Sequence, residues 1–169
     1  MILSIIAAIG KNRELGKDNK LLWEMPADMK HFRDTTRGHA VIMGRKTFES
    51  LPNGPLPNRR NIVITRDENY LRHGVDVVHS IDEALRLAPL AQGEPEEEFF
   101  VIGGAEIYKQ AIEKADKLYI TKVDGNFYAD TFFPEINENI WKEDSIESHE
   151  PDEKNPLPYT FVTYIKKLS

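Results

Sequence analysis

Two stretches, VIMGRKTFES at residues 41–50 and VIGGAEIY at residues 101–108, share the pattern that decides the fold class. Each begins with an apolar run typical of a buried strand, passes through glycine and continues directly into residues that open a helix. Buried strands alternating with helices predict a mainly parallel sheet covered by helices on both faces. Open sheets of this kind bind ligands at the carboxyl ends of their strands, where glycine lets the backbone approach a ligand closely. The two turns are therefore candidate binding loops.

The same alternation extends outward along the rest of the chain. Strands are expected at 3–9, 40–43, 61–65, 75–78, 99–102 and 118–123, and helices at 25–36, 45–51, 81–87 and 105–114. Near the end, residues 141–148 and 159–167 alternate apolar and polar side chains and enclose a proline-rich loop, DEKNPLPY. This pattern predicts an antiparallel hairpin at an edge of the sheet.

Composition narrows the class of protein. A chain of 169 residues is typical of one domain. Its net charge of −6 disfavours nucleic acid and anionic membranes as partners, whereas a local cluster of arginines still allows an anionic ligand. The absence of cysteine excludes a disulfide scaffold and a thiol nucleophile, and it fits a reducing cytoplasm. The opening run MILSIIAAIG lacks a basic n-region, so we interpret it as a buried strand rather than a signal peptide.

Asp28 is the first candidate for chemistry. Pro26 suits the first turn of a helix. Met25, Met29 and Phe32 would then form a core-facing stripe, and Asp28, four residues before Phe32, would lie at its border. Two interpretations stay open. The carboxylate either complements the helix dipole only, or accepts the paired N–H donors of a flat, nitrogen-rich heterocycle.

The two candidate loops could each bind phosphate. Arg45, Lys46 and Thr47 open the helix after the first strand, and helix-start N–H groups with two cations and a hydroxyl form a phosphate cradle. The alternative there is a plain strand-to-helix turn with solvated bases. For Gly103 and Gly104 the alternative is simply a tight turn.

Arginines also flank the strand expected at 61–65. Arg59 and Arg60 precede it and Arg66 follows it. Such side chains are usually solvated, although arginine is also the preferred two-point partner of a carboxylate or phosphate. The five histidines show no metal-ligand spacing and no serine lies in a nucleophile elbow, so we expect neither a metal site nor a hydrolase.

Taken together and in order, these motifs resemble the dihydrofolate reductase family, bacterial chromosomal type, over essentially the whole chain. The motifs are IIAAIGKNRELGKDNKLLW (5–23), W-x-x-P-x-D (23–28), VIMGRKTFES (41–50), PLPNRRNIVITR (55–66), VIGGAEIY (101–108), KLYITKV (117–123) and DTFFPE (130–135). The resemblance implies a three-layer α/β fold of the dihydrofolate reductase type. This is an eight-stranded, mostly parallel, twisted sheet with a C-terminal antiparallel hairpin and helices on both faces. It also implies a single domain, 1–169, with an adenosine-binding half at roughly 39–90.

The activity that the resemblance implies is NADPH-dependent reduction of 7,8-dihydrofolate to 5,6,7,8-tetrahydrofolate, which supplies one-carbon metabolism. A hydride reaches C6 from the cofactor and a proton reaches N5 through water, with Asp28 setting the electrostatics of the ring. The loop at 10–25 would close over the nicotinamide. The expected partners are dihydrofolate and NADPH, with no nucleic acid, membrane or metal, and the expected state is a cytoplasmic monomer.

For the substrate, the resemblance makes Asp28 the catalytic carboxylate that holds the ring N–H and 2-amino group of the pterin, with Thr121 behind it. Ile6 and Ile102 would offer backbone carbonyls to the same ring. Arg59 would clamp the α-carboxylate of the glutamate tail. The other expected substrate-binding residues are Ala8, Met29, Phe32, Arg33, Leu51, Leu56 and Tyr108.

For the cofactor, the resemblance assigns Arg45, Lys46 and Thr47 to the phosphates, and Arg45 with Arg66 to the 2′-phosphate that distinguishes NADPH from NADH. The residues expected to face the nicotinamide are Ala8, Glu14, Leu15, Gly16, Lys17, Asp18, Asn19 and Lys20. Those expected around the pyrophosphate and nicotinamide are Gly103, Gly104, Ala105, Glu106, Ile107 and Tyr108, and Gly44, Thr65 and His79 complete the set. The family also has a cis peptide bond between the paired glycines.

Two positions depart from the family pattern, and two other functions compete. Leu22 stands where most members have proline, and the turn at 51–54 is one residue longer than the commonest bacterial form. The pyrimidine reductase of riboflavin synthesis shares the fold and cofactor but is expected to lack the motif at 23–28. A non-catalytic nucleotide-binding module would not need Asp28, Arg59 and Thr121 together. Loss of NADPH absorbance on addition of dihydrofolate distinguishes these possibilities.

Overall fold

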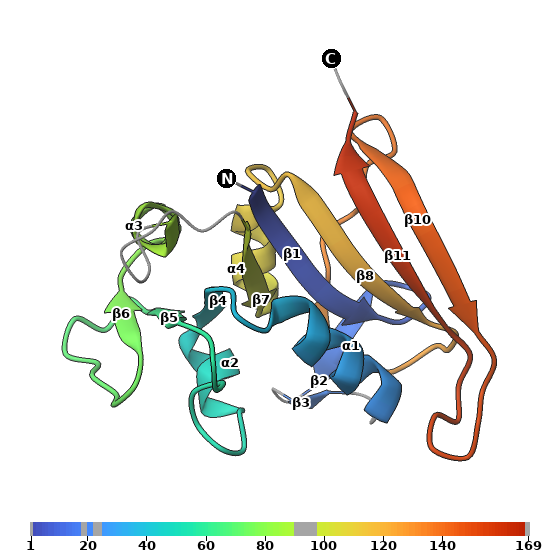
Figure 1. Cartoon of the computed structure of the whole chain (residues 1–169), viewed down its shortest axis with the longest axis horizontal. Coiled ribbons are helices and arrows are strands. Elements are labelled where there is room, and N and C mark those ends of the chain that lie inside the picture. Colours follow the sequence, from blue (N-terminus) through green and yellow to red (C-terminus); the bar gives the residue numbers. More distant parts are fainter. Residues whose placement is uncertain (1, 18–19, 22–24, 90–97, 168–169) are drawn as a thin grey trace.

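The computed structural model describes residues 2–17, 20–21, 25–89 and 98–167. Its centre is an eight-stranded sheet in the order β10-β11-β8-β1-β7-β4-β5-β6 (Figure 1). The strands are β1 (Ile2–Ile9), β4 (Val41–Gly44), β5 (Asn61–Ile64), β6 (Asp76–Val78), β7 (Glu98–Gly103), β8 (Lys117–Val123), β10 (Trp141–His149) and β11 (Tyr159–Lys166). From β8 to β6 every pair is parallel, whereas β11 is antiparallel to both β8 and β10. The mostly parallel sheet with a C-terminal hairpin at its edge is thus confirmed.

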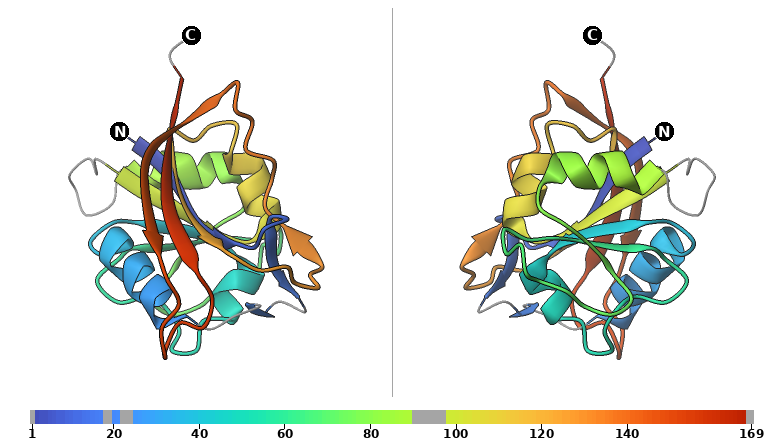
Figure 2. Two further views of the ribbon diagram at one scale, coloured as in Figure 1. Left: turned by 90° about the vertical axis from the view of Figure 1, so that its right-hand side faces the viewer. Right: turned by 90° about the vertical axis from the view of Figure 1, so that its left-hand side faces the viewer.

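Helices cover both faces of this sheet, as predicted. They are α1 (Pro26–Thr36), α2 (Arg45–Glu49), α3 (Ile81–Leu87) and α4 (Ala105–Ala111). The views in Figure 2 place α1 and α2 on one side, and α3 and α4 on the other. Successive side chains of β1 point to opposite faces of the sheet and so pack in two different hydrophobic clusters. Ile5 packs in one cluster with Ala84 of α3 and Ala111 of α4, and Ile6 packs in another with Phe48 of α2.

The start of α1 corrects one prediction. The helix begins at Pro26, and Met25 is its N-cap with an extended backbone (φ −137°, ψ 104°). Met25 is buried and Phe32 half-buried, but 63% of Met29 is exposed, so the predicted core-facing stripe is wrong at Met29. Because Met25 lies outside the helical turn, helical spacing counted from it does not set the direction of Met29.

A second, smaller sheet has no counterpart in the expectations from sequence. It has the order β3-β2-β9 and consists of β2 (Glu14–Lys17), β3 (Lys20–Leu21) and β9 (Thr131–Phe132). The carboxylate of Glu14, the first residue of β2, is buried and accepts hydrogen bonds from the backbone N–H groups of Asn12 and Phe127. Burial alone would raise the pKa of Glu14, but these donors outweigh burial and lower it. Glu14 therefore ties the turn after β1 to the segment that precedes β9.

No helix in the described part of the chain is long and apolar enough to cross a membrane.

Candidate active site

The centre of the site is a hydrogen bond between α1 and β8. Thr121, which is 2% exposed and aligned with Ala8 of β1, donates from Oγ1 to Oδ1 of Asp28 over 2.7 Å. Burial raises the pKa of Asp28, while this hydrogen bond and the nearby His31 oppose the rise. Asp28 is half-buried in the first helical turn. The structure therefore brings the predicted site residues Thr121 and Asp28 into direct contact.

Two backbone carbonyls converge close by. The hydroxyl of Tyr108 lies 2.8 Å from the carbonyl oxygen of Ile6 and 2.9 Å from that of Ile102. Burial, with a contribution from the charge of Asp28, raises the pKa of this phenol, so it stays protonated. A hydroxyl has one proton to donate, whereas each carbonyl has two lone pairs. The carbonyls of Ile6 and Ile102 thus keep acceptor capacity beside the carboxylate of Asp28.

Apolar side chains surround these acceptors. Ile6 belongs to a buried cluster against which the half-buried Phe32, Leu51, Leu56 and Ile102 pack. These four come from α1, from the segments after α2 and before β5, and from β7. The cluster therefore brings three residues predicted as pocket walls, Phe32, Leu51 and Leu56, together with Ile6 and Ile102, and the arrangement suits a flat ring with apolar faces and a polar edge.

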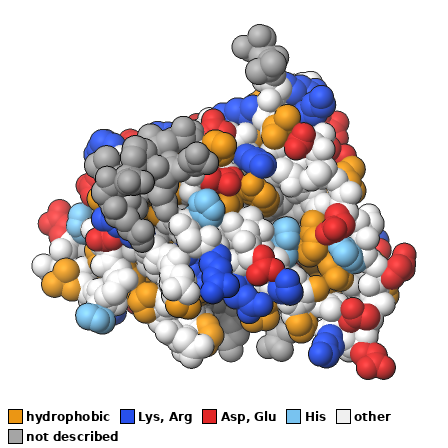
Figure 3. Space-filling view, viewed as in Figure 1, with side chains coloured by type: hydrophobic (Ala, Val, Ile, Leu, Met, Phe, Trp, Pro, Cys, Tyr) orange, Lys and Arg blue, Asp and Glu red, His pale blue; other side chains and the backbone are white. Residues whose placement is uncertain are grey.

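A group of arginines lies at the far end of α1. Arg59 donates from Nη1 to the Oγ1 atom of Thr36 (3.0 Å) and from Nε to the carbonyl oxygen of Pro57 (2.9 Å). Burial, then the charges of Arg37 and Arg33, lower the pKa of Arg59. The molecular surface seen in Figure 3 has Lys and Arg side chains gathered near its middle. Both hydrogen bonds of Arg59 go to neutral oxygens, so its positive charge remains available to an anionic ligand.

The two glycine turns pack against each other. The peptide between Gly103 and Gly104 is cis, as predicted, and Gly103 has a positive φ of 134°. A Cβ atom on Gly104 would lie 3.2 Å from Oγ1 of Thr47, and one on Gly44 would lie 3.3 Å from a side-chain carbon of Ile107. Glycine thus permits this close approach of the starts of α2 and α4, where a larger residue would force a neighbour to shift. The two turns bring the backbone at the carboxyl ends of β4 and β7 together.

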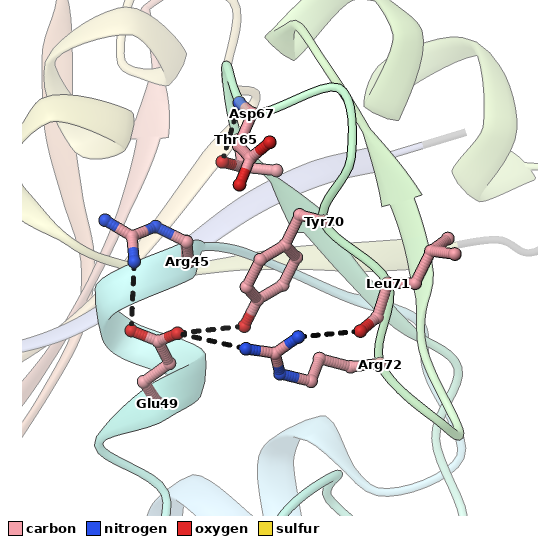
Figure 4. Close-up of polar contacts among 7 residues, drawn as sticks. All are labelled: Arg45, Glu49, Thr65, Asp67, Tyr70, Leu71 and Arg72. Atoms are coloured by element: carbon pink, nitrogen blue, oxygen red, sulfur yellow. Dashed lines mark hydrogen bonds and ion pairs between the residues drawn. The ribbon is translucent and has the colours of Figure 1, made fainter.

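Glu49 organises the cations beside these turns, and sequence reasoning missed it (Figure 4). Its carboxylate lies 3.2 Å from Nη1 of Arg45, accepts a 3.1 Å hydrogen bond from the hydroxyl of Tyr70, and lies 3.9 Å from Nη2 of Arg72. The guanidinium of Arg72 also stacks on the ring of Tyr70 at 4.2 Å. The spacing of four residues between Arg45 and Glu49 was a usable signal, because such pairs are neighbours on a helix.

The structure also describes four other residues predicted to bind the cofactor. Lys46 and Arg66 are exposed, and the buried Thr65 accepts a hydrogen bond from the N–H of Asp67. Nδ1 of His79 lies 2.9 Å from the carbonyl oxygen of Thr65. Thr65, Arg66 and His79 thus lie in one region, after the carboxyl ends of β5 and β6.

Several predicted positions are not placed at the site. Asp18, Asn19, Leu22 and Trp23 lie outside the described residues, as do the side chains of Lys17 and Lys20. The side chain of Glu14 is occupied by backbone donors, as described above. Among the described residues no cluster of acidic or histidine side chains could hold a metal ion. A separate open cleft of about 990 Å³, lined in part by Lys122, Trp141 and Tyr159, contains none of the predicted site residues, and the convergent acceptors identify the site better than cleft size does.

Comparison with known proteins gives consistent matches over the full length. The family model for dihydrofolate reductase matches residues 2–166. The chain is 45% identical to the dihydrofolate reductase of Bacillus subtilis (strain 168) over 168 residues, covering 99% of this chain and 96% of that one. It is 43% identical to the enzyme of the same name from Staphylococcus haemolyticus, covering 96% and 94%. The solved structure of dihydrofolate reductase from Enterococcus faecalis, complexed with NADP(H) and RAB-propyl, superposes with a TM-score of 0.90 at 35% identity, covering 99% and 97%.

The raised pKa of Asp28 has a consequence for stability. Folding disfavours the charged form, so the folded protein binds this proton more readily than the unfolded chain does. This cost to the free energy of folding is absent below the ordinary aspartate pKa of about 4, and it reaches its full size above the raised pKa of Asp28. Asp28→Asn should therefore raise the melting temperature at neutral pH. At the lowest pH the melting temperatures of the variant and the parent protein should become equal. Thermal unfolding measured from about pH 3.5 to pH 8 tests this.

Asp34 of the same helix provides the matched control. Its hydrogen bond from Lys30 lowers the pKa of Asp34, so Asp34→Asn should have the opposite sign, with a slight loss of stability at neutral pH. A difference between Asp28→Asn and the parent protein that does not change with pH would contradict the prediction.

Proposed function

The chain belongs to the dihydrofolate reductase family and reduces dihydrofolate with NADPH, and we propose that the pocket around Asp28 is where this reaction takes place. The observation that carries the proposal is that Thr121 holds the Asp28 carboxylate, and that the charge of this carboxylate acts on the Tyr108 hydroxyl that joins the carbonyls of Ile6 and Ile102. A pterin presents ring N–H and 2-amino donors along one edge, and these acceptors match that edge. Phe32, Leu51 and Leu56 would cover the faces of the ring.

The residues around the glycine turns fit NADPH. The close approach of Gly104 to Thr47 leaves the backbone at the starts of α2 and α4 accessible to the pyrophosphate, and Arg45, Lys46 and Arg66 supply positive charge. We assign residues of the 39–90 half, including Thr65 and His79, to the adenosine end. When bound, NADPH supplies the hydride that is transferred to C6 of the pterin.

The chain itself contributes orientation and charge. Asp28 would hold the pterin through two N–H groups, one on each carboxylate oxygen, and Thr121 fixes the orientation of the carboxylate by donating to Oδ1, which keeps a second lone pair. The negative charge of Asp28 favours protonation at N5, where a proton must arrive through water. The apolar walls around Ile6 and Phe32 keep bulk water from the ring faces and so strengthen this electrostatic effect.

We also propose that the protein is a cytoplasmic monomer of one domain. The large exposed hydrophobic side chains, among them Leu71, Tyr128 and Ile146, come from separate segments rather than one helix face. The cysteine-free composition suits a reducing compartment. A sedimentation coefficient that rises with protein concentration would contradict the monomer.

The central test of the function is Asp28→Asn. If Asp28 anchors the pterin, the change should slow single-turnover hydride transfer by about 10²- to 10⁴-fold. The loss should be greater at high pH, because protons are then scarce, and NADPH affinity should be unchanged. Asp34→Asn, an exposed change on the same helix, is the control and should keep the normal rate. Near-normal hydride transfer by Asp28→Asn above neutrality would remove Asp28 from the mechanism.

A second test concerns Arg59. Arg59→Lys should weaken dihydrofolate binding by roughly tenfold or more and leave NADPH binding unchanged, because lysine cannot form the planar two-point contact with a carboxylate. Arg60→Lys is the neighbouring control, since Arg60 pairs with Asp76 at 2.6 Å. Equilibrium titration with dihydrofolate, and with a pterin that lacks the glutamate tail, gives the comparison. An equal loss for both ligands would show that Arg59 does not bind the tail.

A further inference from the structure

The loop that joins β10 to β11 reaches the start of α1, the helix that carries Asp28 (Figures 1 and 2). Asn155 in this loop is 6% exposed, and its Oδ1 atom accepts a 3.0 Å hydrogen bond from the backbone N–H of Ala27. Ala27 immediately precedes Asp28. The C-terminal hairpin, to which the predicted site residues do not belong, thus contacts the backbone next to the proposed catalytic carboxylate.

The first turn of α1 needs this contact, because its own sequence provides no cap. The N-cap residue is Met25, whose side chain makes no capping hydrogen bond, and Pro26 has no N–H to donate. The N–H of Ala27 is therefore the first donor of the helix, and it has no acceptor within the helix. Asn155 performs the role of an N-cap side chain from 128 residues away in sequence.

Asp152 determines which way the amide of Asn155 points. Its Oδ1 atom accepts hydrogen bonds from the N–H of Lys154 at 2.9 Å, the N–H of Asn155 at 2.8 Å and Nδ2 of Asn155 at 3.0 Å. These backbone and side-chain donors lower the pKa of Asp152. Because Nδ2 is directed at a carboxylate, Oδ1 of Asn155 is left to face the helix.

The hairpin holds the same helix at a second point. The ring of His31, one turn after Asp28, stacks on Phe161 of β11 with centroids 3.9 Å apart and planes at 14°. Phe161 is aligned with Thr121 on β8, the residue that donates to Asp28. Asp28 therefore lies between two contacts with the hairpin, one on each side of it along α1.

We propose that Asn155 is a positioning residue for the reaction. Through Ala27 it fixes the first turn of α1, so that Asp28 keeps its hydrogen bond to Thr121 and its orientation toward the pterin edge. Without Asn155 the turn frays, Asp28 becomes more hydrated, and its charge acts less strongly on N5. The proposal rests on the proposed role of Asp28.

The experiment compares Asn155→Ala with Asp28→Asn and with Asn137→Ala, well below the melting temperature of each protein. Asn137 is the matched control, because its Oδ1 atom also accepts a backbone N–H, that of Asn139, in a loop away from α1. Single-turnover hydride transfer is followed against pH, and affinities for NADPH and dihydrofolate are measured separately. Asp152→Ala, which leaves the acceptor of Asn155 in place, serves as the milder variant and carries the test if Asn155→Ala does not fold.

Asn155→Ala should slow hydride transfer by about tenfold, the ratio that corresponds to about 1.4 kcal/mol. The midpoint of its pH profile should move to lower pH, as for Asp28→Asn but by less, with NADPH affinity unchanged. Asp152→Ala should change the transfer rate and the midpoint in the same directions but by less. Asn137→Ala should change neither the rate nor the midpoint. A lower melting temperature with a normal rate and normal midpoint would reduce Asn155 to a structural cap and overturn the proposal. Normal transfer by Asp28→Asn would overturn the proposed function of Asp28 and this proposal together.

Discussion

The hydrogen bond from Thr121 to Asp28 is the constraint on which the rest of the site depends. It joins a helix on one face of the sheet to a central strand, and it keeps one carboxylate oxygen bonded while the other remains available. Partial removal of a charge from water is unfavourable, as the raised pKa of Asp28 indicates. The eight-stranded sheet and its two apolar cores must compensate for that cost, so the fold supports a site that is locally unfavourable.

Most of the architecture could be predicted because its signals are local. Buried strands such as β1 and β7 are apolar except for Ser4 and Glu98, which bond to each other, and the glycines at the ends of β4 and β7 mark the turns into α2 and α4. The small sheet was missed because strands such as Lys20–Leu21 are too short for a periodic pattern. The direction of Met29 was missed because Met25 caps the helix instead of belonging to it.

The residues of the site also fall into those that the sequence predicted and those that it did not. Asp28, Thr121, Arg59 and the glycine turns were identified from motifs and resemblance, and the structure brings Asp28 and Thr121 into contact. Glu49 and Asn155 were not identified. The contact of Glu49 with the predicted Arg45 could have been found from their spacing of four residues, whereas its contacts with Tyr70 and Arg72 are tertiary. The contact of Asn155 with Ala27 joins residues 128 apart and cannot be read from spacing along the chain.

The position of β11 in the sheet has a further consequence for how the protein is made. β11 lies between β10 and β8, so the strand that follows all the others of this sheet in the sequence is inserted inside the sheet rather than added at its rim. A ribosome that has released α1 and β1 has yet to produce Thr121, Asn155 and Phe161, which are the residues that surround the catalytic helix. The nascent chain therefore carries Asp28 through most of its synthesis without its native surroundings. The surroundings of Asp28 can therefore assemble only once β11 has been synthesised.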